Sequence, residues 1–427
     1  MSFARKLLLC IAFIALSFLF FRICLDNGFW LGYDFVGLEN SVLAARDHSA
    51  IFASEAPFKF QPLVYAVHYL LFLRFGFDAG GYLLFNILLH GLNSFLVYLL
   101  VKTLLRDREV ALVAGLLFVF TVGSYGKSVM TASGLEDLLI TMLTLCTMIF
   151  YFRGELYHGG RMRTPFYLLA LIFFVASMLT RSTSLAILGC FVAFNFFFKK
   201  ERGRQTFDAG LLLFILLAAA SLFVKATVFA YRPPLYTHYP GAVKFVYYAV
   251  KNVFNYLVRM IFPIHTSHLV SEANTAVRFI YRFATEIRIL IALTVVSYSF
   301  FGFVFGNRTI RFFIAWTYIM VLPFAFFQFP SDWLNMRHLY LVSVGFVSVI
   351  AAGAVYCSRM IAETRWRRFV PFVVPLAFVL LSRFIIVQLD RSYEAKAAGP
   401  EITWYRQQLA ERYPEVTLEG DRLIYRK

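Results

Sequence analysis

Long apolar runs recur along almost the whole of this 427-residue chain, and they limit its fold more than any other feature. Hydrophobic residues make up 60% of the sequence, whereas a soluble globular domain contains about 45–50%. Many of the runs reach roughly 18 residues with few charges, the length that a helix needs to cross about 30 Å of hydrocarbon. A transmembrane β-barrel would show short alternating segments instead. The pattern therefore predicts an all-α, polytopic membrane protein.

We expect about 11 transmembrane helices, or roughly 10–13, from the length and spacing of these runs. The predicted spans are residues 7–25, 80–101, 110–123, 135–152, 208–230, 287–305, 312–329, 339–357 and 369–388, together with two short spans between 165 and 198 that meet at Arg181. Interfacial helices are expected at 40–53 and 62–75, in and after the first outer loop. The mid-span residues Asn86, His90 and Asn93 are expected to form hydrogen bonds between helices.

The spans divide the chain into three parts. Residues 1–206 are expected to form an N-terminal catalytic membrane module with the first outer loop. Residues 207–390 are expected to form a second membrane module with an outer segment at 231–286. Residues 391–427 are expected to form a small polar tail outside the membrane, with a helix near 401–412 and two short strands.

The formal net charge of +17 is explained by the membrane, so membrane lipid and not nucleic acid is the expected partner. Basic residues cluster in short connections that alternate with connections carrying acids, as the positive-inside rule requires. We expect a multi-pass integral protein of the bacterial inner (plasma) membrane, with its active site facing the periplasm or the exterior. The 5 cysteines lie in or beside apolar runs and predict neither a disulfide framework nor a zinc site.

Acidic residues at the outer ends of spans are the strongest functional signal in the sequence. Asp34 lies in the loop Gly32–Asn40, after the first span, and a carboxylate at the mouth of a membrane bundle is costly unless it faces water or does chemistry. Glu136 and Asp137 follow a second outer loop. In an alternative interpretation they only begin a helix, where Ser133 caps and the acids complement the helix dipole. Asp34 could likewise be an ordinary solvated acid.

Four motifs follow one another along the chain. They are Asp34 followed by Gln61-Pro62-Leu63, then Gly81–His90, Ser133–Asp137 and Met336–Phe346. In this order they resemble the class C (GT-C) membrane glycosyltransferases, especially the protein O-mannosyltransferase-like branch. The resemblance is best over 26–150 and 325–350. It implies an inverting enzyme that moves a sugar from a polyprenyl-phosphate-linked donor to a glycan, lipid or protein acceptor on the extracytoplasmic face of the membrane.

The resemblance also implies roles for individual residues. Asp34 matches the usual catalytic carboxylate of such enzymes. Asp137, or Glu136, matches their second-loop acid, and Arg337 matches an arginine that could hold the lipid phosphate. Tyr33 stands where many relatives have another acid, which weakens the case for a bound divalent metal. Such a metal is left open as a cofactor, and no residue is assigned as its ligand.

The leaving group in such a transfer is a phosphate, which needs cations or hydrogen-bond donors rather than an acid catalyst. Gln61 replaces an arginine that relatives often carry before Pro-Leu, so the phosphate contact is expected to move to Lys59 or Arg337. The residues expected to bind the lipid phosphate or the sugar are Arg337, Lys59, Arg259, His265, His338 and Glu39. Arg259 and Arg337 could instead anchor at lipid headgroups, and His265 could be ordinary hydrogen-bonded structure.

Two other functions are left open. A transporter or flippase of lipid-linked sugars would place ionisable residues deep within spans or in symmetric halves, whereas the acids here lie at the mouths of spans. An O-antigen ligase or polymerase, another kind of membrane glycosyltransferase, would use an outer loop rich in arginine and histidine. The segment 231–286 keeps this interpretation open.

Overall fold

The computed structural model describes residues 3–30, 32–55, 58–121, 128–157, 164–199, 209–228, 242–261, 284–325, 336–361, 369–420 and 422–426. These residues form helices and a single two-stranded sheet near the C-terminus. In chain order the elements are α1 Phe3–Phe21, η1 Arg22–Asp26, α2 Gly32–Arg46, η2 His48–Phe52, α3 Pro62–Phe75, α4 Ala79–Leu105, α5 Arg108–Phe120, η3 Ala132–Gly134, α7 Leu135–Tyr157, α8 Thr164–Thr180, η5 Ser182–Leu185, α9 Ala186–Phe194, η6 Asn195–Lys199, α10 Ala209–Thr227, α11 Ala242–Ile261, α14 Ala284–Phe305, α15 Arg308–Ala325, η8 Met336–His338, α16 Leu339–Ile361, α17 Val370–Ala397, α18 Pro400–Arg412, β1 Val416–Glu419 and β2 Arg422–Tyr425.

Within the described ranges, 7 helical segments are long and apolar enough to cross a membrane. They are Phe3–Asp26, Ala79–Leu105, Ala132–Leu156, Ser182–Lys199, Gly210–Thr227, Glu286–Phe305 and Leu339–Met360. Shorter apolar helices lie at Pro62–Phe75, Thr164–Thr180 and Val370–Leu380. A helix overlaps every predicted span, which confirms the polytopic helical class. The number of about 11 spans is not confirmed, because several of these helices are shorter than the roughly 20 residues that a span needs.

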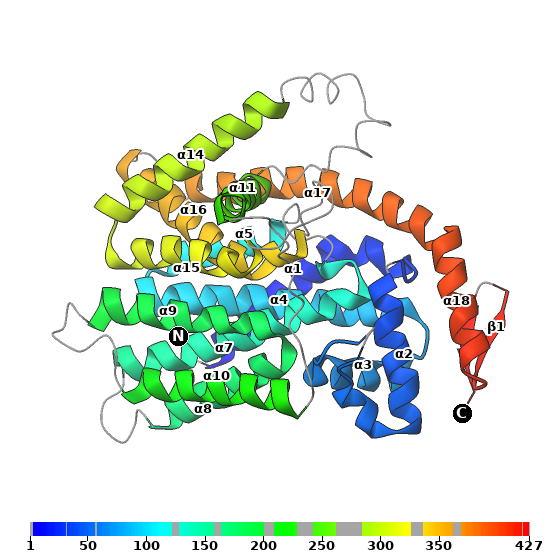
Figure 1. Ribbon diagram of the computed structural model, residues 1–427. Helices are drawn as coiled ribbons and strands as arrows, with labels where there is room; N and C mark the ends of the chain where they lie inside the picture. Colours follow the sequence, from blue (N-terminus) through cyan, green and yellow to red (C-terminus); the bar gives the residue numbers. More distant parts are fainter. Residues whose placement is uncertain are drawn as a thin grey trace.

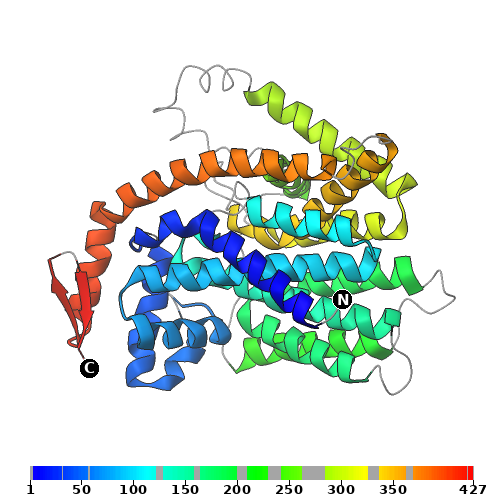
Figure 2. The ribbon, with the colours of Figure 1, turned by 180° about the vertical axis from the view of Figure 1, so that it is seen from behind.

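The long helices form a bundle with α4 near its centre (Figure 1). α4 packs against α1, α5 and α7, and α1 lies across it on the side seen in Figure 2. α2 and α3 pack against each other at one end of the bundle. Large apolar side chains are exposed along α1, α10 and α14, for example Leu8, Leu216 and Phe300. An apolar surface of this extent is unfavourable in water, and in an integral membrane protein it contacts lipid.

Polar side chains join the helices at the centre of the bundle. His90 Nδ1 lies 2.7 Å from the Tyr340 hydroxyl, and Asn93 Nδ2 donates to the same hydroxyl at 3.3 Å. Asn86 Nδ2 donates to the Thr131 carbonyl oxygen at 2.7 Å. These bonds tie α4 to α16 and to the turn before α7. The predicted hydrogen bonds between helices are therefore confirmed.

The segment Gly32–Asn40 was expected to be a loop, and this is wrong, because it forms the first half of helix α2. One face of that helix buries Phe35, Leu38 and Val42, which follow the spacing of an amphipathic helix. Glycine and polar residues between them dilute this pattern in the sequence. Asp34 falls in the first turn, where the helix dipole favours a negative charge.

The other two helices expected in and after the first outer loop are present in whole or in part, and their position at the membrane interface stays a prediction. The expected helix at 40–53 appears as the end of α2 followed by η2, and α3 covers Pro62–Phe75 as predicted. Of the outer segment 231–286, the structure describes 242–261, which contains α11, and 284–286. The rest of that segment lies outside the described residues.

The C-terminal tail forms a small unit of α18, β1 and β2. The strands pair antiparallel, with Val416 opposite Tyr425. Gly420 turns the chain between them with φ of +61°, a conformation that glycine adopts without steric cost. The predicted helix and two strands are therefore confirmed. α17 runs past residue 390 to Ala397 before the tail begins, and the division into modules stays a prediction.

Candidate active site

Asp34 is fully buried in the first turn of α2. Its Oδ1 accepts a hydrogen bond from the Ser133 backbone N–H at 2.7 Å, and its Oδ2 accepts one from the Trp30 N–H at 3.3 Å. Both donors are main-chain groups, so they fix the orientation of the carboxylate without adding a full charge. Ser133 belongs to η3, directly before α7. The bond therefore joins the two segments that the sequence predicted as the first and second outer loops.

Asp137 lies in the first turn of α7, between two arginines. Arg337 Nε donates to its Oδ2 at 2.7 Å, and Arg181 Nη1 donates to its Oδ1 at 2.9 Å. The Ser128 hydroxyl also donates to Oδ2, at 3.2 Å. Charge-assisted bonds from guanidinium groups are among the stronger hydrogen bonds in proteins. They hold a carboxylate whose side chain is only 4% exposed.

Glu136 shares both of these arginines. Its Oε1 lies 3.1 Å from Arg181 Nε and accepts a hydrogen bond from Gln61 Nε2 at 2.8 Å. Its Oε2 lies 4.0 Å from Arg337 Nη2. Gln61 directly precedes α3, so Glu136 ties that helix to α7. The two second-loop acids thus hold the arginines in place.

Ser133 connects Asp34 to this ion network. Arg337 Nη2 donates to the Ser133 carbonyl oxygen at 2.5 Å, and Nη1 donates to its hydroxyl at 3.2 Å. The same residue's N–H holds Asp34, so Ser133 connects Asp34 to the network that contains the second-loop acids. Burial alone would lower the pKa of the Arg337 guanidinium, but Asp137 and Glu136 outweigh it and raise that pKa above its ordinary value.

His338 lies beside the arginines, just before α16. Its Nε2 is 3.4 Å from Arg181 Nη2, and its ring packs against Phe324 with 4.2 Å between the ring centroids. Burial, and then the charges of Arg181 and Arg337, hold the pKa of His338 well below its ordinary value. The ring is therefore neutral near pH 7, and its Nε2 can accept a hydrogen bond from Arg181.

Lys59 is the exposed cation of the site. Its Nζ lies 5.1 Å from the centroid of the Tyr33 ring, and its charge acts on both Glu136 and His338. Its backbone N–H donates to the Tyr65 hydroxyl at 3.0 Å. Among the predicted phosphate ligands that the structure describes, Lys59 combines a side chain open to solvent with a charge that acts on Glu136.

The C-terminal unit holds α2 from the side. The Tyr405 ring stacks on Phe35, which follows the buried carboxylate, with 5.3 Å between centroids and 9° between planes. Glu39 accepts hydrogen bonds from Arg412 at 2.8 Å and from the Tyr413 hydroxyl at 2.9 Å. Glu39 was expected to bind substrate. In the structure its carboxylate docks the C-terminal unit, and a role of Glu39 in substrate binding stays a prediction.

The last two predicted ligands lie farther out. Arg259 is half-buried on α11, one turn after Tyr256. The Tyr256 ring lies 6.5 Å from that of His338 between centroids, so Arg259 adjoins the cluster through this tyrosine. His265 lies outside the described residues. The functional roles assigned to both residues stay predictions.

Arg181 is the residue that the sequence analysis missed, since it was treated only as a break between two short spans. Its guanidinium contacts Glu136, Asp137 and His338. A signal was present, because a charge that interrupts a long apolar stretch needs a partner. Asp137 lies 44 residues away in sequence and His338 lies 157 away, so the pattern gave no way to identify the partners.

A metal donor set does not gather at these acids. Among the described residues, no group of 3 or more His, Cys, Asp and Glu side chains could hold a metal ion. Asp34 accepts main-chain N–H bonds, and Glu136 and Asp137 accept bonds from arginine. Guanidinium groups thus supply the positive charge beside the second-loop acids.

No protein-family model and no curated protein matches this chain. Solved structures with a similar fold include the oligosaccharyltransferase of Archaeoglobus fulgidus in its apo form, with TM-score 0.55 and 12% identity over 96% of this chain and 58% of that chain. AglB from the same organism, with an inhibitory peptide and a dolichol-phosphate, gives TM-score 0.54 and 14% identity over 97% and 59%. ArnT from Cupriavidus metallidurans, in the apo state, gives 0.50 and 14% over 98% and 82%.

At these identities the similarity is one of fold alone. This chain spans about three-fifths of the oligosaccharyltransferase chains that it matches. The neighbours are GT-C glycosyltransferases, and this chain shares their fold. The protein O-mannosyltransferase-like branch is not specifically confirmed.

Proposed function

We propose that this protein is an inverting glycosyltransferase that moves a sugar from a polyprenyl-phosphate-linked donor to an acceptor on the extracytoplasmic face of the membrane. One observation carries the proposal. A buried carboxylate, Asp34, is oriented by main-chain N–H groups and joined through Ser133 to a cluster of arginines at the end of a membrane bundle. A carboxylate beside cations is the arrangement that transfer from a phosphate ester requires.

In the proposed reaction, Asp34 accepts the proton of an acceptor hydroxyl as that oxygen attacks the anomeric carbon. The bond from the anomeric carbon to the phosphate oxygen breaks on the opposite face of the sugar, which inverts the configuration. The electron pair leaves with polyprenyl phosphate. Lys59 meets the phosphate from the solvent side, and Arg337 and Arg181 supply positive charge behind it.

The structural neighbours support the kind of donor. AglB was solved with a dolichol-phosphate, which is a lipid phosphate of the class proposed here. The exposed apolar surface of the bundle offers the lipid chain of such a donor a place in the bilayer. The sugar and the acceptor are not assigned.

The test is a transfer assay with the purified full-length protein in proteoliposomes. The protein is supplied with polyprenyl-phosphate sugars, and released polyprenyl phosphate is measured. We expect turnover by the wild type, and a loss of roughly 10²–10⁴-fold in kcat for Asp34→Asn, the range that general-base catalysis contributes. Asp26→Asn is the matched control, because it makes the same change at an exposed position eight residues earlier.

Two outcomes contradict the proposal in different ways. Turnover that is unchanged in Asp34→Asn removes Asp34 from the mechanism. Movement of the carrier across the bilayer without cleavage of the sugar–phosphate bond favours a flippase. Binding of the donor is measured in parallel. We expect Asp34→Asn to retain this binding, because other residues contact the phosphate of the donor.

A further inference from the structure

A second polar feature lies at the opposite end of the bundle. It is a cavity of about 330 Å³ between Arg106 and Arg308, here called the arginine cavity. Its walls come from the ends of α4, α7, η6, α15 and α16. Asn86 on α4 bonds to Thr131, in the turn before the two acids of α7. Leu104 on the cavity wall lies 18 residues farther along α4, which is about 27 Å along the helix axis. The arginine cavity is therefore separate from the candidate active site.

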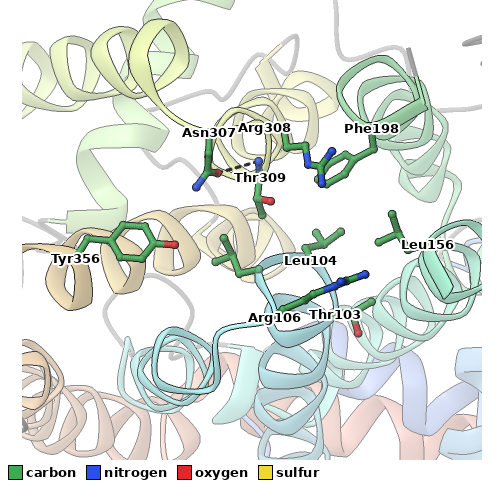
Figure 3. Close-up of a pocket in the computed structure, with 10 residues that line it drawn as sticks. Thr103, Leu104, Arg106, Leu156, Phe198, Asn307, Arg308, Thr309 and Tyr356 are labelled. Carbon is green, nitrogen blue, oxygen red and sulfur yellow. Dashed lines mark hydrogen bonds between the residues drawn. The ribbon is translucent and has the colours of Figure 1, made fainter. Parts of the chain in front are cut away.

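Polar side chains from several elements line the arginine cavity. Arg308 and Arg106 lie on facing walls, and the Tyr356 hydroxyl points toward the space between them (Figure 3). Thr103 and Thr309 also line the cavity and are buried. None of the described residues that line the cavity is acidic.

Three described acids that lie close in sequence to lining residues are engaged by other cations. Asp107, which directly follows Arg106, and Glu109 accept bonds from Arg359 at 2.6 Å and 2.8 Å. Glu155 is buried, with Oε1 2.9 Å from Lys199 Nζ. The described lining of the cavity thus presents guanidinium groups and no carboxylate, a composition that suits an anion.

Both cavity arginines stand where the local backbone disfavours them. Arg106 ends α4 with φ of +59°, a left-handed conformation for which glycine or asparagine is the usual choice. Arg308 begins α15, where the helix dipole opposes a positive charge. Its guanidinium lies 5.1 Å from the centroid of the Phe198 ring, which fixes its place on the wall. Positions that break local rules are expected at functional sites.

We propose that the arginine cavity binds the phosphate group of an amphiphilic phosphoester. The two guanidinium groups contact the phosphate, and Leu104 and Phe198 contact the apolar part. Arginine suits phosphate geometrically, and basic pockets between transmembrane helices bind anionic lipid headgroups. A general attraction between surface charge and the membrane would make no distinction between the cavity arginines and other basic residues nearby. The site does not depend on the proposed transfer reaction.

The first arm of the test uses phosphatidylglycerol and phosphatidylcholine. Delipidated full-length protein in a non-ionic detergent is titrated with each lipid, and bound lipid is counted by native mass spectrometry. We expect the wild type to prefer phosphatidylglycerol, and Arg106→Asn and Arg308→Gln each to weaken its binding by about fivefold. Asparagine suits the left-handed backbone at 106. Arg108→Gln is the control, because Arg108 is exposed at the same end but does not line the cavity.

The second arm uses inorganic phosphate as the probe. It tests whether the bound phosphate group belongs to a free phosphoester and not to a lipid headgroup. In that case millimolar phosphate raises the apparent Tm of the wild type and of Arg108→Gln, but not that of the cavity variants, and no preference for phosphatidylglycerol is seen. Either arginine-dependent result supports the site. Equal behaviour of the wild type, the cavity variants and Arg108→Gln in both arms overturns the proposal. Arg308→Gln relieves an unfavourable charge at a helix start, so it carries the test alone if Arg106→Asn does not fold.

Discussion

The two ends of the bundle differ in how far their charged side chains are buried. At the carboxylate end, Asp137 and Glu136 are bonded to Arg181 and Arg337, and these side chains are 4–18% exposed. At the other end, Arg106 and Arg308 are exposed around a cavity whose described walls hold no acid. A charge that is buried needs a partner, because its desolvation is costly. The paired end thus fixes a geometry, whereas at the cavity end two guanidinium groups are exposed to solvent, where we propose that they meet a ligand.

Arg337→Gln tests the paired end and carries the largest expected effect on stability. The substitution leaves Asp137 buried with one guanidinium fewer, and breaking such a pair costs about 3–5 kcal/mol. The free energy of unfolding in mixed micelles measures the effect. Adding Asp137→Asn removes the uncompensated charge, so the double variant is expected to recover part of the loss. A double variant no more stable than Arg337→Gln alone would show that the Asp137 pair is not the cause.

Much of this end could be predicted from the sequence. Asp34, Glu136 and Asp137 are acids at the ends of apolar runs. Such residues stand out in the sequence, because an acid beside a membrane segment is costly and therefore rare. Arg337 was predicted from the motif in which it lies, and the sequence did not indicate which residue it contacts. The bounds of α3 were predicted because proline opens that helix and Gly76 closes it.

The rest could not be predicted, because it depends on contacts between distant segments. Arg337 meets Asp137 across 200 residues, and Arg412 meets Glu39 across 373. Periodicity reports one face of one helix and contains no information about which other helix covers it. The start of α2 was missed for a related reason, since its buried face is completed by Tyr405 from the C-terminal unit.

Tyr405→Ala tests whether the C-terminal unit holds α2 in place. Loss of the ring removes the stack on Phe35 and is expected to weaken local stability by about 1–2 kcal/mol, or roughly tenfold in the opening of α2. Hydrogen exchange of the amides in residues 32–46 measures that opening. Tyr405→Phe keeps the ring and is expected to match the wild type. Equal protection in Tyr405→Ala and the wild type would separate the tail from the site.

His338 makes the paired end sensitive to acid. Its pKa in the folded protein is held below its ordinary value, by burial first and then by Arg181 and Arg337. The unfolded chain therefore binds the proton more readily below about pH 6.5, and stability from this group is full above that pH and is lost as the pH falls toward the folded-state pKa. The expected loss is up to about 1.4 kcal/mol for each pH unit below 6.5.

The check compares unfolding free energies at pH 7.5 and pH 5.5. His338→Gln is expected to lose less stability than the wild type between these two values, because the group that must charge on unfolding is gone. His48→Gln removes an exposed histidine on η2 and serves as the control. If His338→Gln and the wild type lose equal stability on acidification, His338 is not the group that responds to pH.

Arg359→Gln makes at the cavity end the same change as Arg337→Gln makes at the paired end, and its expected effect is the smallest. Arg359 bonds to Asp107 and Glu109, but these side chains are 18–35% exposed, so water screens them and solvates whichever partner is left behind. We expect a loss of about 1 kcal/mol or less, and a smaller one in 0.5 M salt, where the screening length is only a few Å. The loss from Arg337→Gln should hardly respond to salt, because buried pairs are screened much less. Equal losses with equal salt dependence at the two ends would mean that burial does not distinguish them, and the contrast between a fixed network and an accessible cavity would lose its physical basis.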